Sequence, residues 1–163
     1  MTFKRIDNIE IENARILFRN FSGIEKRYNA AGNRNFCLVI DDDDYAQTLN
    51  EDGWNVKILK PRDEYESPTH YIPVFVRFDV LPPEVFLVTK RKMTMLNEET
   101  IGALDFADII NIDLVVRPRR YTRDDGSTGI KAYLNTMYVT IEENPFAEKY
   151  ANLGNDVMDD TPF

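Results

Sequence analysis

The segment IINIDLVVRPRRYT (residues 109–122) is followed by RDDGSTG (123–129) and then by IKAYLNTMYVTIE (130–142). Both long segments are rich in β-branched and aromatic residues and alternate apolar with polar side chains, a pattern typical of half-buried strands. The segment between them contains Asp-Gly and a second glycine, which are strong hairpin signals. The sequence therefore predicts a long antiparallel hairpin over 109–142, with Pro118 at an edge position or a bulge.

Strand-like segments also precede this hairpin. They span residues 12–20, 33–40, 54–60, 71–79 and 84–95. Residues 41–53 follow a helical period instead, starting with four aspartates and ending with a glycine, which predicts one short helix. Seven strand-like segments with one or two short helices predict an all-β fold, mainly antiparallel, built as a barrel or sandwich.

The net charge of −8 is concentrated in two places. Residues 41–44 contribute −4 and the segment from Glu143 onward another −4, so the rest of the chain is neutral overall. The basic residues of that body are clustered, at residues 90–92 and 117–123. A basic groove is therefore compatible with the acidic total.

Length and composition place the chain among single-domain globular proteins, since 163 residues with 43% hydrophobic side chains can bury a sizeable core. No run of about eighteen apolar residues is present, so we expect no membrane helix. The beginning of the sequence lacks the apolar core of a signal peptide. The single cysteine, Cys37, is expected to be a buried small side chain. A reducing, cytoplasmic setting is the simplest expectation.

No set of residues indicates an enzyme, a cofactor or a metal site. The four consecutive aspartates at 41–44 could suggest a metal-dependent nuclease, but two-metal catalysis needs carboxylates that converge from different elements. A helix N-terminus, where acids cap the backbone and favour the dipole, explains them better. His70 is the only histidine, and no phosphate-binding loop motif occurs.

Alternation divides each predicted strand into two faces, and on several strands the face opposite the apolar one is both aromatic and cationic. In 71–79, Phe75 and Arg77 share the second face, and in 130–142 Lys131 and Tyr133 do. Exposed rings stack on bases while Arg and Lys hold phosphates, so this combination predicts binding of single-stranded nucleic acid. The alternative is that these rings pack beneath loops and the arginines pair with surface acids.

The candidate DNA-binding residues are of two kinds. Those expected to stack on bases are Phe21, Tyr28, Trp54, Tyr71, Phe75, Tyr121 and Tyr133. Those expected to contact phosphates are Arg15, Arg19, Lys26, Arg27, Arg34, Arg77, Lys90, Arg91, Lys92, Arg117, Arg119, Arg120 and Lys131.

The last five residues, DDTPF (159–163), resemble the acidic C-terminal tip of bacterial and phage single-stranded DNA-binding proteins. That tip is a run of Asp followed by a small or apolar residue, Pro and Phe. The body is similar to a phage-encoded family of such proteins with an OB-fold core. The segments that carry this similarity are FRNFSGIEKRYNAAGNRNFCLVI, DGWNVKILKPR, IDLVVRPRR and GIKAYLNTMYVTIEE.

This resemblance implies an elaborated OB-fold barrel over residues 1–143 and a flexible, disordered acidic tail over 144–163. It implies a protein that coats single-stranded DNA without strong sequence preference during phage or bacterial replication and recombination, in the host cytoplasm if phage-encoded. The tip would dock replication, recombination and repair proteins through Asp159, Asp160, Pro162 and Phe163. Thr161 departs from the pattern, because Ile is common there.

Two other functions are weighed against this one. The first is a β-barrel adaptor or virion-associated protein that uses the acidic tail to bind protein and does not bind nucleic acid. The second is a carboxylate nuclease, which would cleave DNA only with a divalent metal. The sequence leaves open the choice of DNA over RNA and whether the chain forms a homo-oligomer such as a dimer.

Overall fold

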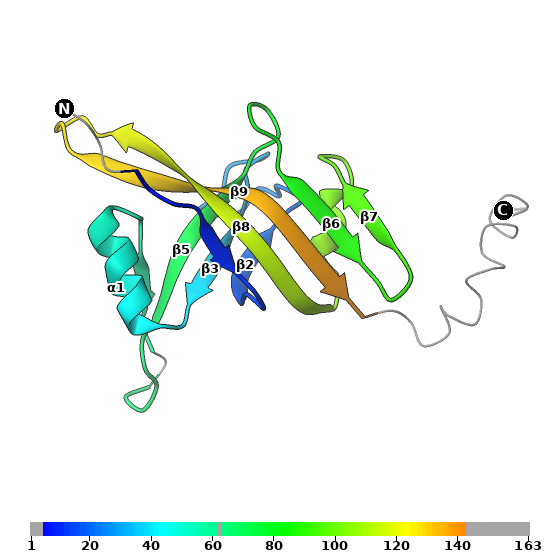
Figure 1. The fold of residues 1–163 in the computed structure, drawn as a ribbon, viewed down its shortest axis with the longest axis horizontal. Helices are drawn as coiled ribbons and strands as arrows, with labels where there is room; N and C mark the ends of the chain where they lie inside the picture. Colours follow the sequence, from blue (N-terminus) through cyan, green and yellow to red (C-terminus); the bar gives the residue numbers. More distant parts are fainter. Residues whose placement is uncertain (1–4, 62, 143–163) are drawn as a thin grey trace, which may run out of the picture.

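The computed structural model describes residues 5–61 and 63–142, so the predicted tail over 144–163 and its tip lie outside the described residues. Nine strands, one α-helix and one short 3-10 helix make up the described part (Figure 1). They are β1 (Ile9–Ile11), β2 (Ile16–Asn20), β3 (Arg34–Ile40), α1 (Asp43–Asp52), β4 (Lys57–Leu59), β5 (Thr69–Val76), β6 (Glu84–Val88), β7 (Met93–Leu96), η1 (Ile101–Asp105), β8 (Ile109–Thr122) and β9 (Thr128–Ile141).

The strands form one mixed sheet that closes on itself. Its order is β1-β8-β9-β5-β3-β2, with only the β5–β9 and β6–β9 pairs parallel. The strands β1 and β2 are consecutive in the chain but stand at opposite ends of this order, where β1 pairs with β8 and β2 pairs with β3. Between them, the Ala14 amide donates to the Ile112 carbonyl at 2.7 Å. One stretch of chain therefore joins both edges, as in an OB-fold barrel.

Three additions elaborate this barrel. Helix α1 and β4 come between β3 and β5 in the sequence, and β4 pairs with β5. The β6–β7 hairpin is joined to β9 through β6. The predicted fold class, mainly antiparallel β with an elaborated OB-fold barrel and a short helix, is confirmed for the described residues.

The hairpin of β8 and β9 is the longest element, as the alternating sequence predicts, and its register shifts twice, between Ile109 and Asn111 and between Val115 and Val116. Val115 pairs with Thr136 while Val116 pairs with Leu134, so Asn135 is an extra residue in β9. A bulge reverses which side of the sheet alternate residues face. Strict alternation from Lys131 and Tyr133 predicts that Tyr138 lies on the opposite, apolar face with Leu134, and this is wrong: Leu134 is buried and Tyr138 is exposed.

The predicted helix is confirmed, and its aspartates act as a cap. The Asp42 carboxylate accepts hydrogen bonds from the amides of Asp44 (2.9 Å) and Tyr45 (3.2 Å). Gly53 ends the helix with φ +109°, a conformation that glycine adopts without steric cost. The aspartates at 41–44 therefore have a structural role at the start of α1.

The prediction of one strand over 84–95 is wrong, because β6 and β7 form a hairpin with Lys90, Arg91 and Lys92 near its turn. The Thr89 amide donates to the Lys92 carbonyl at 2.9 Å, closing a turn that contains neither Gly nor Pro. A segment without those residues carries no turn signal that local composition can reveal.

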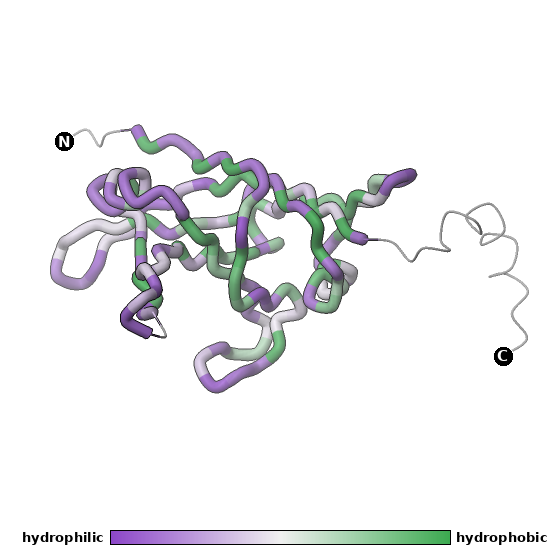
Figure 2. The backbone as a smooth tube through the Cα atoms, turned by 90° about the horizontal axis from the view of Figure 1, so that it is seen from below, coloured by the Kyte–Doolittle hydropathy of each residue, from purple (hydrophilic) through white to green (hydrophobic). Residues whose placement is uncertain are grey.

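The core fills the barrel with the inward faces of the long strands, and the projecting loops are mainly hydrophilic (Figure 2). Two rings proposed for base stacking belong to this core. Phe21 is fully buried against Phe36, with ring centroids 5.5 Å apart. Trp54 is 3% exposed, and it follows α1, whose Ala46 and Leu49 join the same core. The expectation that Phe21 and Trp54 are exposed is therefore wrong.

Candidate nucleic-acid interface

A row of side chains crosses four strands on the outside of the barrel. Asn35 of β3 pairs with Phe75 of β5, Phe75 with Tyr133 of β9, and Tyr133 with Arg117 of β8. The Phe75 and Tyr133 ring centroids lie 5.9 Å apart, and the Arg117 guanidinium lies 5.0 Å from the Tyr133 ring. The row faces outward because the residues flanking Phe75, Val74 and Val76, are buried in the core.

A second group continues this row toward the tip of the β8–β9 hairpin. The Lys131 ammonium lies 5.9 Å from the Phe75 ring and 5.5 Å from the Tyr121 ring. The Arg123 guanidinium lies 5.1 Å from the Tyr121 ring and donates to its hydroxyl at 3.1 Å. Rings and cations thus form one continuous row. We call Phe75, Arg117, Tyr121, Lys131 and Tyr133 the aromatic–cationic strip.

Gly129 lets the Tyr121 ring lie against β9. The two residues are paired across the hairpin, and a Cβ at Gly129 would lie 2.8 Å from the Tyr121 ring. A larger residue there would displace the ring. Gly129 therefore positions a strip residue as well as favouring the turn.

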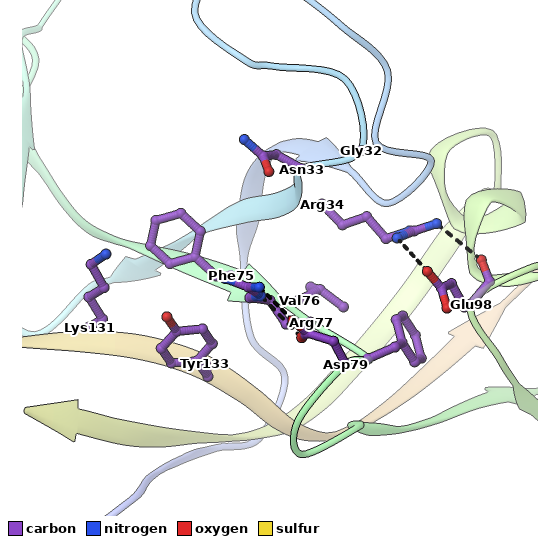
Figure 3. Close-up of a pocket in the computed structure, with 11 residues that line it drawn as sticks. Gly32, Asn33, Arg34, Phe75, Val76, Arg77, Asp79, Glu98, Lys131 and Tyr133 are labelled. Carbon is purple, nitrogen blue, oxygen red and sulfur yellow. Dashed lines mark hydrogen bonds and ion pairs between the residues drawn. The ribbon is translucent and has the colours of Figure 1, made fainter.

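A groove of about 440 Å³ opens beside the strip (Figure 3). Its lining includes Lys131, Phe75 and Tyr133 at one end and Arg34 and Glu98 at the other, with Arg77 and Asp79 between them. In an OB-fold the second and third strands of the barrel, here β3 and β5, carry the usual nucleic-acid-binding face. The groove lies on this face.

Both arginines of the groove are paired with carboxylates. Arg77 contacts Asp79 through two bonds, Nη2–Oδ2 at 2.6 Å and Nε–Oδ1 at 3.2 Å. Arg34 lies 3.5 Å from the Glu98 carboxylate. The hydrogen bond from Arg77 holds the pKa of Asp79 below its ordinary value, and the same bond raises the pKa of Arg77.

The loop over residues 21–33 forms one side of the groove and presents Tyr28, which is 90% exposed and stacked with Arg27 at 5.3 Å. Asn29 holds this loop together: its side-chain amide donates to the carbonyls of Ile24 and Asn33, each at 3.0 Å. Its oxygen accepts from Asn35 at 2.8 Å. Because Asn35 pairs with Phe75, the loop is tied to the strip.

The predicted site residues fall into separate groups. The strip and groove contain Arg34, Phe75, Arg77, Arg117, Tyr121, Lys131 and Tyr133, and Arg119 pairs with Lys131 at their edge. Lys26, Arg27 and Tyr28 are exposed on the adjoining loop, and Tyr71 lies on β5 beside Lys57. Tyr133 is only 6% exposed, so it supports Phe75 and Arg117 from below, and the expectation of an open ring is wrong for it.

Six predicted phosphate contacts lie away from the groove, the strip and the adjoining loop. Arg15 lies 3.8 Å from Asp41, and Arg19 donates to the Ala107 carbonyl at 3.1 Å. Both contribute to another surface depression, beside the start of β8. Arg120 lies near α1. Lys90, Arg91 and Lys92 are at the β6–β7 turn.

Sequence reasoning missed six groove-lining residues: Gly32, Asn33, Val76, Phe78, Asp79 and Glu98. Alternation assigned Phe78 to the core face, and its half-buried ring does pack against the core, but it also lines the groove. The Arg34 guanidinium lies 5.8 Å from the Phe78 ring. The signal that could have identified Asp79 is its spacing from Arg77, since residues two apart on an extended chain lie on one side.

Within residues 5–61 and 63–142, no three His, Cys, Asp or Glu side chains lie close enough to hold a metal ion. The same residues include no helix of the length and apolarity needed to cross a membrane.

Comparison with known proteins gives a family and a fold. Residues 1–160 match the family model described as "Putative phage ssDNA-binding domain". No curated protein sequence matches. Among solved structures, the chain is similar to the single-stranded DNA-binding protein from bacteriophage Enc34 in complex with ssDNA, with a TM-score of 0.54 and 14% identity over 85% of this chain and 89% of that one.

Two further structures of the Enc34 protein are also similar. For one of them, a C-terminal truncation, the TM-score is 0.52 and the identity 15%, over 85% of this chain and 88% of that chain. The other has a TM-score of 0.52 and 15% identity, over 92% of this chain and 89% of that one. At these identities the similarity establishes the fold. Because the family model covers nearly the whole chain, the protein belongs to the phage single-stranded DNA-binding domain family.

Proposed function

We propose that this protein binds single-stranded DNA along the aromatic–cationic strip and the groove beside it. The observation that carries the proposal is the continuous row of rings and cations over β5, β9 and β8, from Arg117 through the paired rings of Tyr133 and Phe75 and then Lys131 to Tyr121. Family membership and the Enc34 structure in complex with ssDNA support the same ligand.

The chemistry of this surface favours binding without strong sequence preference. Phe75 and Tyr121 offer ring faces, on which any base can stack. Lys131 stands beside both rings and Arg117 beside the neighbouring Tyr133, where they can contact the phosphates that connect stacked bases. We infer that the protein coats single strands during replication or recombination in the host cytoplasm, and that it binds without catalysing a reaction.

Titration of a fluorescent oligo(dT) at increasing salt tests this function. We expect affinity to fall steeply, because each phosphate neutralised on a single strand contributes about −0.7 to the slope of log K against log salt. Duplex DNA of the same length should bind much more weakly, because its stacked bases cannot reach the rings. Equal affinity for duplex and single strand would overturn the stacking mechanism, and no binding to either would favour the adaptor function.

We also propose that residues 1–143 are the DNA-binding domain and that residues 144–163 form a segment that recruits partner proteins. The support is the DDTPF string, whose Asp159, Asp160, Pro162 and Phe163 match the tip of bacterial and phage single-stranded DNA-binding proteins. Replication, recombination and repair proteins would be the partners. Capture of such proteins by the full chain and by Phe163→Ala tests the proposal.

A further inference from the structure

The groove divides into two halves that differ in how their cations are balanced. Among the described residues, Arg117 and Lys131 of the strip have no carboxylate partner within 4.0 Å. Arg77 in the middle of the groove and Arg34 at its other end each face a carboxylate (Figure 3). A phosphate therefore meets open cations in one half and neutralised ones in the other.

The Asp79 carboxylate contacts Arg77 as a phosphate would. It places its two oxygens against Nη2 and Nε, the planar fork that arginine also offers to two phosphate oxygens. Because Asp79 is only two residues from Arg77, it stays near the guanidinium at a high effective concentration. DNA can use this edge of Arg77 only by displacing Asp79.

We propose that Asp79 sets the affinity of the groove for single-stranded DNA by occupying the phosphate position on Arg77. The inference rests on the proposed function, since it concerns the same site and ligand. Glu98 has the same role toward Arg34, more weakly, because its single carboxylate contact is 3.5 Å long. The groove thus contains its own competitor for phosphate.

Removing the Asp79 charge should tighten binding and change its salt dependence. Both partners are more than half exposed, and exposed ion pairs contribute little, so Asp79→Asn should bind oligo(dT) about two- to fivefold more tightly at low salt. A carboxylate displaced by DNA regains a counterion, which offsets part of the counterion release. The slope of log K against log salt should therefore be steeper in Asp79→Asn, by up to about 0.7.

The experiment compares fluorescence anisotropy titrations of oligo(dT) with the full chain and four variants. Glu64→Gln, an exposed residue of the β4–β5 loop that does not line the groove, is the matched control for the loss of one negative charge. Arg77→Gln and the double variant Arg77→Gln with Asp79→Asn test whether Asp79 acts through Arg77. We expect Asp79→Asn to bind oligo(dT) more tightly than the full chain. In the Arg77→Gln background, adding Asp79→Asn should raise the affinity no more than Glu64→Gln raises that of the full chain.

Three outcomes would overturn the inference. In the first, Asp79→Asn binds oligo(dT) with the same affinity as Glu64→Gln. In the second, Asp79→Asn raises the affinity equally with and without Arg77. In the third, Asp79→Asn binds more weakly than the full chain, which would mean that Asp79 positions Arg77 for DNA. If Asp79→Asn lowers the melting temperature, Asp79→Ser gives the same comparison. Failure of the wild-type chain to bind oligo(dT) would instead contradict the proposed function, so the two failures are distinguishable.

Discussion

Replacing Phe75 by alanine is expected to weaken oligo(dT) binding by about 1–3 kcal/mol, or about 5- to 150-fold, because one stacked base loses its ring. Phe75 stands at the centre of the strip, between the Tyr133 ring and the Lys131 ammonium. It is also the strip residue paired with Asn35, which ties the 21–33 loop to the groove. Anisotropy titration at constant salt measures the loss.

Two matched variants separate stacking from folding. Phe75→Tyr keeps a ring and should retain most of the affinity. Trp54→Ala removes a ring from the core and should lower the free energy of unfolding by about 3–5 kcal/mol, while Phe75→Ala, at a half-buried position, should unfold close to the wild type. If Phe75→Ala unfolds as easily as Trp54→Ala, then Phe75 is a core residue and the strip is wrongly assigned.

Replacing Phe163 by alanine is expected to abolish capture of replication and repair proteins from a host lysate, with oligo(dT) affinity unchanged. In the proposed docking, the ring enters an apolar pocket of the partner while Asp159 and Asp160 meet its basic rim, and such aromatic anchors dominate interface energies. Captured proteins would be identified by mass spectrometry.

Phe146→Ala, which removes a ring between 144 and 163 but leaves DDTPF intact, is the control and should capture partners normally. A chain ending at Asn155 should also bind oligo(dT) somewhat more tightly at low salt, because tethered acids compete with phosphates for the groove. Capture that is indifferent to Phe163 would contradict the docking. Unchanged DNA affinity at every salt concentration would contradict the competition.

Much of the fold follows from local patterns in the sequence. The β8–β9 hairpin was predicted from alternation and its Asp-Gly turn, and α1 from its acidic start and Gly53. The bulge at Asn135 was not predictable, because an extra residue in a strand leaves no distinct mark in composition. The turn between β6 and β7 was missed because it contains charged residues instead of Gly or Pro.

The candidate site was only partly predictable, because which strands become neighbours is a long-range property. Alternation grouped Phe75 with Arg77 and Lys131 with Tyr133, yet it could not show that Phe75 and Tyr133 meet across a parallel strand pair. It also could not separate the groove cations from Arg15 and Arg19, which lie on another part of the barrel. Local pattern identifies the chemistry of a face, and strand pairing decides where it is assembled.

Exposed aromatic residues outside the strip make a sharp test of where DNA binds. Phe106 is 83% exposed and Phe18 is 65% exposed, more than any strip ring, and neither lines the groove. If exposure alone governed stacking, these residues would be the preferred contacts.

The decisive measurement is therefore photochemical cross-linking of the full chain to oligo(dT) that carries 5-iodouracil, followed by mass spectrometric mapping of the linked residues. Binding along the strip and groove predicts cross-links to Phe75 in β5 and to Tyr121 in the β8–β9 hairpin, both lost when unlabelled oligo(dT) competes. Cross-links confined to Phe18 or Phe106, with none on these strands, would contradict it.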